Sequence, residues 1–350
     1  MGRKGVRRRW YLDTHGIRRT GSKPNFHYVT ASGKDVEDEK TLQRIRKLGI
    51  PPAWREVRIA RSDSSPLQAV GIDARGRTQY RYHSRFRQKR DEEKFLRIVR
   101  FGESLPKLRR RVSRDLGRKD LDREHVLSAI VRLIDQGFFR VGNDRSARSE
   151  STYGLTTVRK NHVRVSGEDV LFDYIGKWKK PHRRAIRDPA VARLVKKLRR
   201  LGKKDDELFR YLKGSRMIDI KDRHVNEYIQ QTIGEDFTAK DFRTWAGTLL
   251  CSIALAMQGQ ATTKKERKRR VRKAIEATAS LLGNTPAVSR SSYICPRLLE
   301  DFMGGREVET LPRSRRARPV ARRGLSNEER ALLKYLRETI ADRRKSPRAA

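Results

Sequence analysis

Residues 238–257 read Thr-Ala-Lys-Asp-Phe-Arg-Thr-Trp-Ala-Gly-Thr-Leu-Leu-Cys-Ser-Ile-Ala-Leu-Ala-Met and contain the start signal and the body of one apolar helix. Thr238 and Asp241 have the spacing of a capping box, in which the residue three positions into the helix accepts a hydrogen bond from the N-cap backbone. The apolar residues that follow predict a helix through Met257. A helix of this kind belongs inside a helical domain.

The flanking sequence supports a mainly helical domain over residues 91–304. One helix is predicted between Asp122 as N-cap and Gly137 as stop, and another starts at Asp188-Pro189 and ends at Gly202. Between them, residues 161–165 and 170–177 alternate around Ser166-Gly-Glu-Asp169, which is typical of a β-hairpin. We therefore expect a helical domain with a β-hairpin insertion.

The first 90 residues show a different period. Short β-prone stretches alternate with turn-forming residues, and one short helix is expected before Pro51-Pro52. Residues 305–350 are expected to form a basic, Pro-containing linker and a final helix over 326–343. The predicted fold class is α+β, with a small antiparallel sheet domain over residues 1–90. The expected elements of that domain are strands at 26–30, 54–60, 67–72 and 78–82 and a helix at 39–47.

The charge of the chain points to a polyanionic partner. Its 350 residues include 85 Lys and Arg against 42 Asp and Glu, which gives a formal charge of +43. Nucleic acid is the default partner of such a surplus. A membrane protein is not expected, because the sequence has no apolar run of about 18 residues and no lipidation motif. Cys251 and Cys295 have no metal-ligand spacing, and the basic N-terminal residues are not followed by the apolar stretch of a secretory signal, so secretion is not expected. We expect a cytoplasmic, nucleoid-associated protein without a bound metal.

Four short segments carry residues that could do chemistry on a phosphate. Taken singly each is weak, because an arginine in so basic a chain is usually on the surface and a lone tyrosine usually contributes to packing. Their order and spacing carry more information than any one of them. The segments are Phe139-Arg-Val-Gly-Asn-Asp144 with Tyr153-Gly-Leu-Thr-Thr157, Tyr174-Ile-Gly-Lys177, Lys240-Asp-Phe-Arg-Thr-Trp245, and Leu282-Gly-Asn-Thr-Pro286 with Ser291-Ser-Tyr-Ile294.

Together these segments resemble the type IB DNA topoisomerases, in particular the short bacterial and poxvirus-like members. The resemblance runs from about Gly16 to Phe302. In the first 95 residues it covers Gly16-Ile-Arg-Arg19, Ile50-Pro-Pro-Ala-Trp54, Leu67-Gln-Ala-Val-Gly71, Gly76-Arg-Thr-Gln-Tyr-Arg-Tyr-His83 and Arg90-Asp-Glu-Glu-Lys-Phe95.

The resemblance implies an enzyme that relaxes supercoiled double-stranded DNA by cutting and resealing one strand, without ATP, metal or another cofactor. Tyr293 would be the nucleophile that forms a 3′-phosphotyrosyl link, and Arg140 and Arg243 would bind the phosphate oxygens. Lys177 would protonate the leaving 5′-oxygen, and Asn284 would donate to a phosphate oxygen. A phenol has a pKa near 10, so such a nucleophile needs strong electrostatic help.

The same resemblance implies a monomer that acts as a clamp on DNA. Side chains of the N-terminal motifs are expected to contact DNA, since amide and aromatic groups on a strand can reach groove edges and phosphates. These are Gln68, Gln79, Tyr80, Tyr82 and His83.

The sequence departs from the family pattern at a few positions. Asn284 stands where many members have histidine, Ser146 and Glu150 replace an expected tyrosine and asparagine, and Trp178-Lys-Lys-Pro181 replaces a small-residue turn.

Two alternatives stay open from the sequence. One is a tyrosine recombinase or integrase, whose usual His-x-x-Arg box would need histidine in place of Lys240. The other is a non-enzymatic nucleoid DNA-binding protein, which explains the charge but not the ordered series of motifs.

Overall fold

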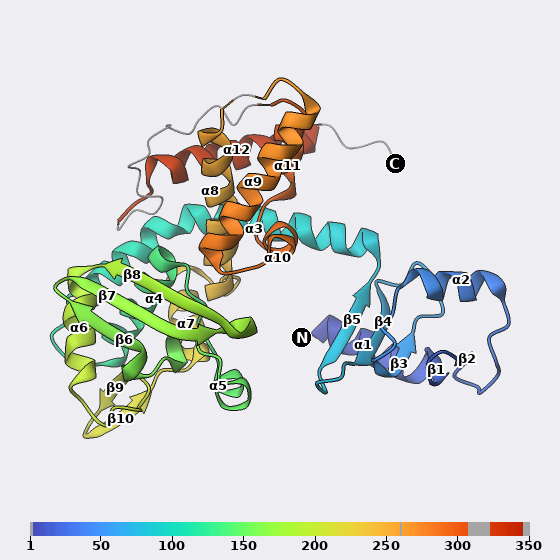
Figure 1. Ribbon diagram of the computed structural model, residues 1–350, viewed down its shortest axis with the longest axis horizontal. Coiled ribbons are helices and arrows are strands. Elements are labelled where there is room, and N and C mark those ends of the chain that lie inside the picture. The colour runs from blue at the N-terminus through green and yellow to red at the C-terminus, as the bar shows by residue number, and fades with distance from the viewer. Residues whose placement is uncertain (1–2, 260, 307–322, 346–350) are drawn as a thin grey trace. The chain divides into compact units, whose positions relative to one another are not determined.

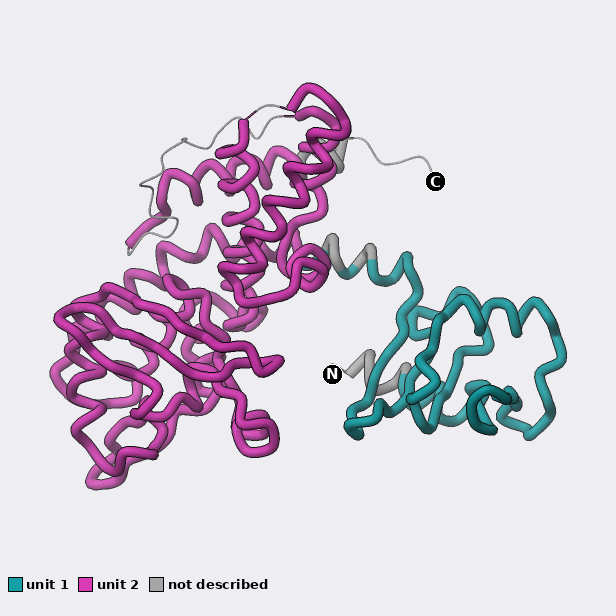
Figure 2. The backbone as a smooth tube through the Cα atoms, viewed as in Figure 1, with its two compact units in different colours: residues 1–94 teal, residues 95–350 magenta. Residues whose placement is uncertain are grey.

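The computed structural model describes residues 3–259, 261–306 and 323–345, and the chain divides into two compact units (Figure 2). Unit 1 is Met1–Lys94 and unit 2 is Phe95–Ala350. The division falls inside the long helix α3 (Ser84–Asp115), slightly beyond the boundary expected at residue 90. Most of the expected linker, residues 307–322, lies outside the described residues, and the last helix belongs to unit 2.

Unit 1 is built on a five-stranded antiparallel sheet with the strand order β2-β1-β3-β4-β5 (Figure 1). The four predicted strands and the predicted helix are present within one residue of their expected bounds. The sequence does not predict β1 or α1, because both are rich in arginine and have little apolar periodicity. The bounds are α1 Arg3–His15, β1 Ile17–Gly21, β2 Phe26–Val29, α2 Glu39–Lys47, β3 Arg55–Ile59, β4 Leu67–Ile72 and β5 Thr78–Tyr82.

The sheet of unit 1 is covered on both faces at its centre. From α2, Ile45 packs in a cluster that includes Ala69, and from α1, Leu12 packs in a cluster that includes Leu67 and Val70. Five of the six residues of β4 are buried as a result. This double burial explains why the strand is apolar without alternation.

Unit 2 contains helices and two small antiparallel sheets, β6-β7-β8 and β9-β10 (Figure 1). The predicted β-hairpin is therefore two strands of a three-stranded sheet. The sequence does not predict β8, because His182 is its only buried side chain and no apolar alternation marks it. The bounds are α4 Arg123–Gly137, α5 Asp144–Glu150, η1 Leu155–Thr157, η2 Lys160–His162, β6 Val163–Ser166, β7 Asp169–Gly176, η3 Lys177–Lys179, β8 Lys180–Arg187, α6 Pro189–Arg199, β9 Arg210–Lys213, β10 Arg216–Asp219, α7 Asp222–Ile233, α8 Ala239–Met257, α9 Lys264–Leu282, α10 Pro286–Ser292, α11 Pro296–Met303 and α12 Asn327–Lys345.

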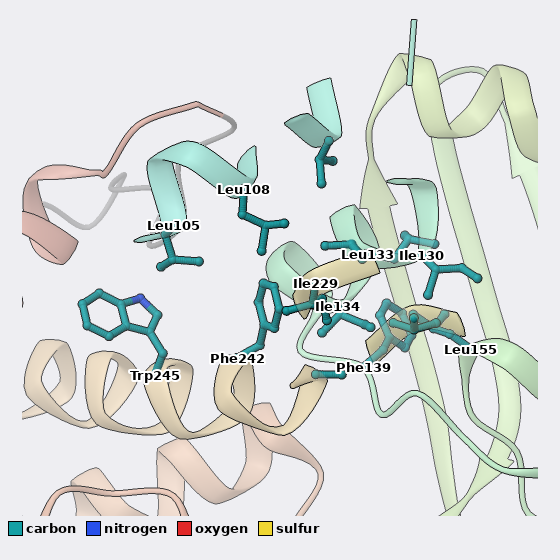
Figure 3. Close-up of a cluster of buried hydrophobic side chains, with 14 of the residues drawn as sticks. Leu105, Leu108, Ile130, Leu133, Ile134, Phe139, Leu155, Ile229, Phe242 and Trp245 are labelled. Atoms are coloured by element: carbon teal, nitrogen blue, oxygen red, sulfur yellow. The ribbon is translucent and has the colours of Figure 1, made fainter. Parts of the chain in front are cut away.

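The predicted central helix is α8, and it packs in the main hydrophobic core of unit 2 (Figure 3). At its start, Asp241 Oδ2 accepts a hydrogen bond from the Thr238 backbone N–H at 2.8 Å. Trp245 packs against α3 at Gly102, where an added Cβ would lie 2.5 Å from the indole ring. The absence of a side chain at Gly102 thus lets α3 approach α8 closely.

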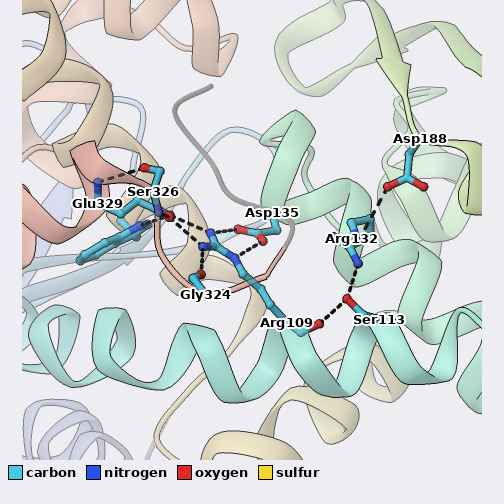
Figure 4. Close-up of polar contacts among 9 residues, drawn as sticks. Arg109, Ser113, Arg132, Asp135, Asp188, Gly324, Ser326 and Glu329 are labelled. Carbon is cyan, nitrogen blue, oxygen red and sulfur yellow. Dashed lines mark hydrogen bonds and ion pairs between the residues drawn. The ribbon is translucent and has the colours of Figure 1, made fainter. Parts of the chain in front are cut away.

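A buried charge network attaches α12 to the rest of unit 2 (Figure 4). Arg109 of α3 donates to both carboxylate oxygens of Asp135 and to both of Glu329. Glu329 also accepts from Trp245 Nε1 at 3.2 Å and closes a capping box with Ser326. Removing one member of such a buried network would leave an uncompensated charge and cost roughly 3–5 kcal/mol.

Candidate active site

Arg140 lies in an extended segment that follows α4. Leu155 N–H donates to Arg140 O at 3.0 Å, so this segment pairs with the one after α5. The two backbones cross at Gly142 and Gly154, where a Cβ on Gly154 would lie 2.4 Å from Gly142 Cα. Only glycines fit at this crossing, and the crossing fixes the direction in which Arg140 leaves the backbone.

Arg243 lies in the second turn of α8 and is 4% exposed. It donates to Phe138 O and, through Nη2, to Leu282 O at 2.8 Å. These carbonyls stand at the C-terminal ends of α4 and α9. Arg243 therefore connects three helices that are far apart in the sequence.

The neighbouring arginines are held in the same way. Arg140 Nη2 lies 3.4 Å from Gly283 O, and Arg184 of β8 donates to Gly137 O at 2.7 Å and to Leu281 O. The last carbonyls of a helix lack intrahelical partners and carry partial negative charge. In the part of the chain that the structure describes, none of the three arginines has an ion pair with a carboxylate. Helix ends hold the guanidiniums, and their charge stays available to an anion.

Asn284 joins Arg140 and Arg243. Its Oδ1 accepts from Nη2 of Arg243 at 3.2 Å and from Nη2 of Arg140. Because guanidiniums only donate, the amide oxygen must face them and the amide nitrogen must point elsewhere. That nitrogen is buried and has no hydrogen-bond partner, as are Nη1 of Arg140 and Nε of Arg243. Three buried donors, one on each of these side chains, are therefore without a protein partner.

Tyr293 follows α10 directly and packs on Arg243. The Arg243 guanidinium carbon lies 5.1 Å from the centre of the Tyr293 ring. Burial alone would raise the pKa of the phenol, but the positive charges of Arg243, Arg140 and Lys240 outweigh it and lower that pKa. Burial and then the charge of Arg140 lower the pKa of Arg243 in turn. Like charges crowd this site, and an anion would relieve them.

The backbone of Tyr293 is fixed by α8. Thr248 Oγ1 lies 3.2 Å from Tyr293 O and accepts a hydrogen bond from Cys295 N at 3.1 Å. A Cβ built on Gly247 would lie 2.6 Å from Tyr293 O. The helix that carries Arg243 therefore also sets the position of Tyr293, a signal that the sequence pattern does not reveal.

Four of the five predicted catalytic residues line one open pocket: Arg140, Lys177, Arg243 and Tyr293. Lys177 is exposed at the turn between β7 and β8. Asn284 is 6% exposed and reaches the pocket through the two arginines. The structure thus gathers the five residues from four separate stretches of the sequence.

One residue that the sequence does not single out, His182, supports this arrangement. His182 stacks on Tyr174 with ring centres 5.3 Å apart, and its ring fills the space beside Gly283. Burial first, and then Arg184, Arg140 and Arg243, lower the pKa of His182 to about 4. A neutral imidazole therefore backs the turn that presents Asn284. By contrast, His125 and His162 bind backbone groups: His125 Nδ1 lies 2.7 Å from Asp120 O, and His162 Nδ1 accepts from Arg159 N at 3.1 Å.

The predicted DNA contacts of unit 1 do not share one face. Tyr80 and Tyr82 stack with ring centres 6.1 Å apart and pack toward the cluster that includes Leu12. Gln79 alternates with them on β5, and its Nε2 donates to Asp73 at 2.9 Å. Side chains one residue apart on a strand point to opposite faces. A contact by all of them would have to follow β5, which is the edge of the sheet.

Gln68 is a correction, because it does not face outward at all. It is 2% exposed, its Nε2 donates to three backbone carbonyls of the preceding loop, and its Oε1 accepts from Arg44 at 3.0 Å. A buried amide with every strong site occupied cannot also contact DNA. His83 is half-buried, and its Nδ1 accepts from Arg85 N. DNA contact by His83, Gln79, Tyr80 and Tyr82 stays a prediction.

Neither a metal-binding group nor a membrane-spanning helix is found in the part of the chain that was searched. Among the described residues, no three or more His, Cys, Asp or Glu side chains are placed to hold a metal ion. No described helix is both long and apolar enough to cross a membrane. Cys251 and Cys295 are buried and are not joined by a disulfide, and burial raises the pKa of Cys251 to about 12.

Two protein-family models match the chain. Residues 83–301 match the eukaryotic DNA topoisomerase I catalytic core, and residues 25–73 match the N-terminal domain of bacterial DNA topoisomerase IB. The chain is 34% identical over 300 residues to the DNA topoisomerase 1B of Acanthamoeba polyphaga mimivirus, covering 83% of this chain and 89% of the viral protein. It is 25% identical over 236 residues to the DNA topoisomerase 1B of vaccinia virus (strain Copenhagen), covering 66% and 71% of the two chains.

Proposed function

The chain belongs to the type IB DNA topoisomerases, and we propose that Tyr293, Arg140, Arg243, Lys177 and Asn284 carry the cleavage and resealing reaction of this family. Enzymes of this type relax supercoiled DNA through a transient cut in one strand. The observation that carries the assignment is the shared pocket of Arg140, Arg243, Lys177 and Tyr293. Within it, donors on the two arginines have no protein partner.

In the proposed first step, the Tyr293 oxygen attacks a backbone phosphorus. The new phosphorus–oxygen bond joins Tyr293 to the 3′ end, the bond to the 5′-oxygen breaks, and the phenolic proton passes to water. The positive charges around Tyr293 lower its pKa and so favour the ionised nucleophile. The product is a phosphodiester like the starting bond, so resealing by the 5′-hydroxyl needs no ATP.

Arg140 and Arg243 stabilise the charge that develops on the non-bridging oxygens. Both are pre-positioned by helix-end carbonyls, so little reorganisation is needed when the phosphate arrives. Asn284 orients both guanidiniums through Oδ1, and its Nδ2 is the donor that remains for the phosphate. No step of this scheme is assigned to a metal ion.

Lys177 is proposed to protonate the leaving 5′-oxygen. Its position on an exposed turn at the rim of the pocket lets the ammonium reach a groove of the duplex while Tyr293 attacks from the buried side. In-line displacement requires the nucleophile and the leaving oxygen on opposite sides of the phosphorus. We further propose that one copy of the chain acts on DNA as a clamp, in a nucleoid-associated setting.

The recombinase alternative is not favoured. Position 240 is Lys rather than the histidine of the His-x-x-Arg box, and the relatives are topoisomerases. A non-enzymatic nucleoid protein would leave the buried donors of Arg140, Arg243 and Asn284 that have no protein partner without a cause.

The test is relaxation of supercoiled plasmid in EDTA without ATP. The wild-type chain should relax the plasmid and yield no recombinant product, and Tyr293→Phe should leave it supercoiled at every enzyme concentration. Relaxation by Tyr293→Phe would overturn the assignment.

A further inference from the structure

The turn between β7 and β8 has a backbone that its sequence does not favour. Trp178 has φ of 68° and Lys179 has φ of 53°, both in the left-handed region. Glycine and asparagine adopt this region readily, whereas larger side chains do so at a cost in stability. Two such residues in succession are unusual. Strain of this kind tends to persist at functional sites.

The strained turn also presents a large aromatic side chain to solvent. Trp178 is 57% exposed, and Lys177 Nζ lies 5.4 Å from the centre of its ring. Lys179 and Lys180 follow directly, so the indole stands within a run of positive charge. Neither the strain nor the exposed ring stabilises the free protein. Both would be useful if the turn had a binding partner.

The position of the turn indicates which partner. Lys177, next to Trp178, lines the pocket that also holds Arg140, Arg243 and Tyr293. A polyanion whose phosphate enters that pocket must place its neighbouring nucleotides close to this turn. Lysines on a protruding turn match the phosphates of a duplex, and an aromatic ring among them matches a base step.

We propose that Trp178 is a DNA-contacting positioning residue whose ring packs into the base step beside the phosphate that Tyr293 attacks. The proposal rests on the proposed function, because it needs DNA in that pocket. The contact has two effects: it holds the duplex in register at the site of cleavage, and it sets the reach of Lys177, its neighbour in the turn. Wedges of this kind partly unstack the base step that they enter.

The experiment compares three variants in duplex binding and cleavage. Trp178→Asn removes the ring but suits the left-handed backbone, Trp178→Phe keeps an aromatic face, and Lys179→Gly removes one charge. Binding is measured in the Tyr293→Phe background, so that no covalent adduct forms. The probe is a duplex that carries 2-aminopurine on either side of the cleavage site mapped with the wild-type protein.

Trp178→Asn should bind the duplex about 5- to 150-fold more weakly, the range that corresponds to loss of one base–aromatic stack. The slope of affinity against salt should not change, because an uncharged ring releases no counterions. The rise in 2-aminopurine fluorescence that unstacking of the base step produces should disappear. Trp178→Phe should retain most of the affinity and most of the fluorescence rise. Lys179→Gly should instead reduce the salt slope by about 0.9 and keep the fluorescence change.

The melting temperature separates this role from a structural one. Trp178→Asn should melt no lower than the wild type, because the strained residue is replaced by one that fits. A melting temperature of Trp178→Asn below that of the wild type, or an unchanged affinity and fluorescence, would overturn the proposal. If the wild type still forms covalent adducts in that case, the proposed function stands without it. If the wild type forms no adduct, the proposed function fails and this proposal fails with it.

Discussion

The two parts of the candidate site place positive charge in opposite ways. Arg140 and Arg243 are held by the ends of α4 and α9, and Arg243 is 4% exposed. The β7–β8 turn with Lys177 is exposed, and Trp178 within it is 57% exposed. The first arrangement fixes charge before the substrate arrives, at a cost in desolvation. The second leaves charge in water until DNA covers it.

This difference teaches how a basic protein can separate catalysis from binding. A buried guanidinium that is held by helix-end carbonyls and has no carboxylate partner both joins those helices and can bind an anion, so its removal should affect the reaction and the fold together. A solvated lysine on a turn should affect the reaction alone. The predictions below test this contrast, beginning with the largest effect.

Replacing one basic residue by another should have different consequences at the buried Arg243 and at the exposed Lys177. Arg243→Lys keeps one charge but cannot reach both helix ends, so we expect cleavage to slow by roughly 10³-fold and stability to fall by about 1–3 kcal/mol. Lys177→Arg should slow cleavage without a change in the melting temperature. Single-turnover cleavage and thermal melts of both variants measure this. Equal losses of stability would break the contrast.

A carboxylate in the buried centre should separate stability from activity. Asn284→Asp places an anion against Arg140 and Arg243, so the arginines would pair with the protein instead of the phosphate. We expect cleavage to fall by about 10²-fold, while the melting temperature stays the same or rises. Asn284→Ala serves as the control, since it removes the amide without supplying a charge. A stable Asn284→Asp enzyme of normal rate would show that the arginines do not bind the phosphate.

The backbone crossing of Gly142 and Gly154 should affect the cleavage rate through the position of Arg140. In Gly154→Ala, the new Cβ would lie 2.4 Å from Gly142 Cα, so the backbone that carries Arg140 must move. We expect a loss of about 1–3 kcal/mol and a cleavage rate lower by roughly tenfold. Gly304→Ala is the matched control, because its Cβ would meet nothing closer than 3.4 Å. Similar behaviour of the two variants would argue against a tightly fixed Arg140.

The smallest expected effect is a shift in the titration of Tyr293. Its pKa is lowered in the folded protein, so its ionisation stabilises the fold above the ordinary phenol pKa, and this contribution is lost as the pH falls through the lowered value. Removing Arg140 should move that pKa upward, whereas removing Lys177 should leave it in place. Ultraviolet difference titration against Tyr293→Phe measures it. An upward shift in Lys177→Ala alone would reverse the assignment of the two regions.

The sequence predicts the fold best where one local signal dominates. The bounds of α8, β4 and β5 agree with the expected ones, because apolar runs lie between clear start and stop residues. The sequence does not predict β8, because its pairing with β7 and not its own composition makes it a strand. α1 is not predicted for a similar reason: among residues 9–15, the part of this helix whose burial the structure describes, only Leu12 belongs to a buried cluster.

The site follows the same rule. The five predicted catalytic residues come together in unit 2, and their motifs are local in sequence. Arg184, His182 and Gly247 act through packing against residues far along the chain, and no spacing pattern encodes that. Gln68 shows the reverse error: it sits in a motif, but the motif serves the interior of unit 1. A family pattern marks conserved chemistry and conserved packing alike, and only geometry separates them.

The account depends most on Tyr293 as the covalent link, and peptide mapping tests this directly. Trypsin should release residues 291–297 as one peptide, because it cuts after Arg290 and after Arg297. Tyr293 is the only tyrosine of this peptide. After reaction with a duplex that traps the cut state, nuclease and trypsin digestion should yield this peptide with a nucleotide mass on Tyr293. A nucleotide on any other residue, or an unmodified peptide beside cut DNA, would contradict the account.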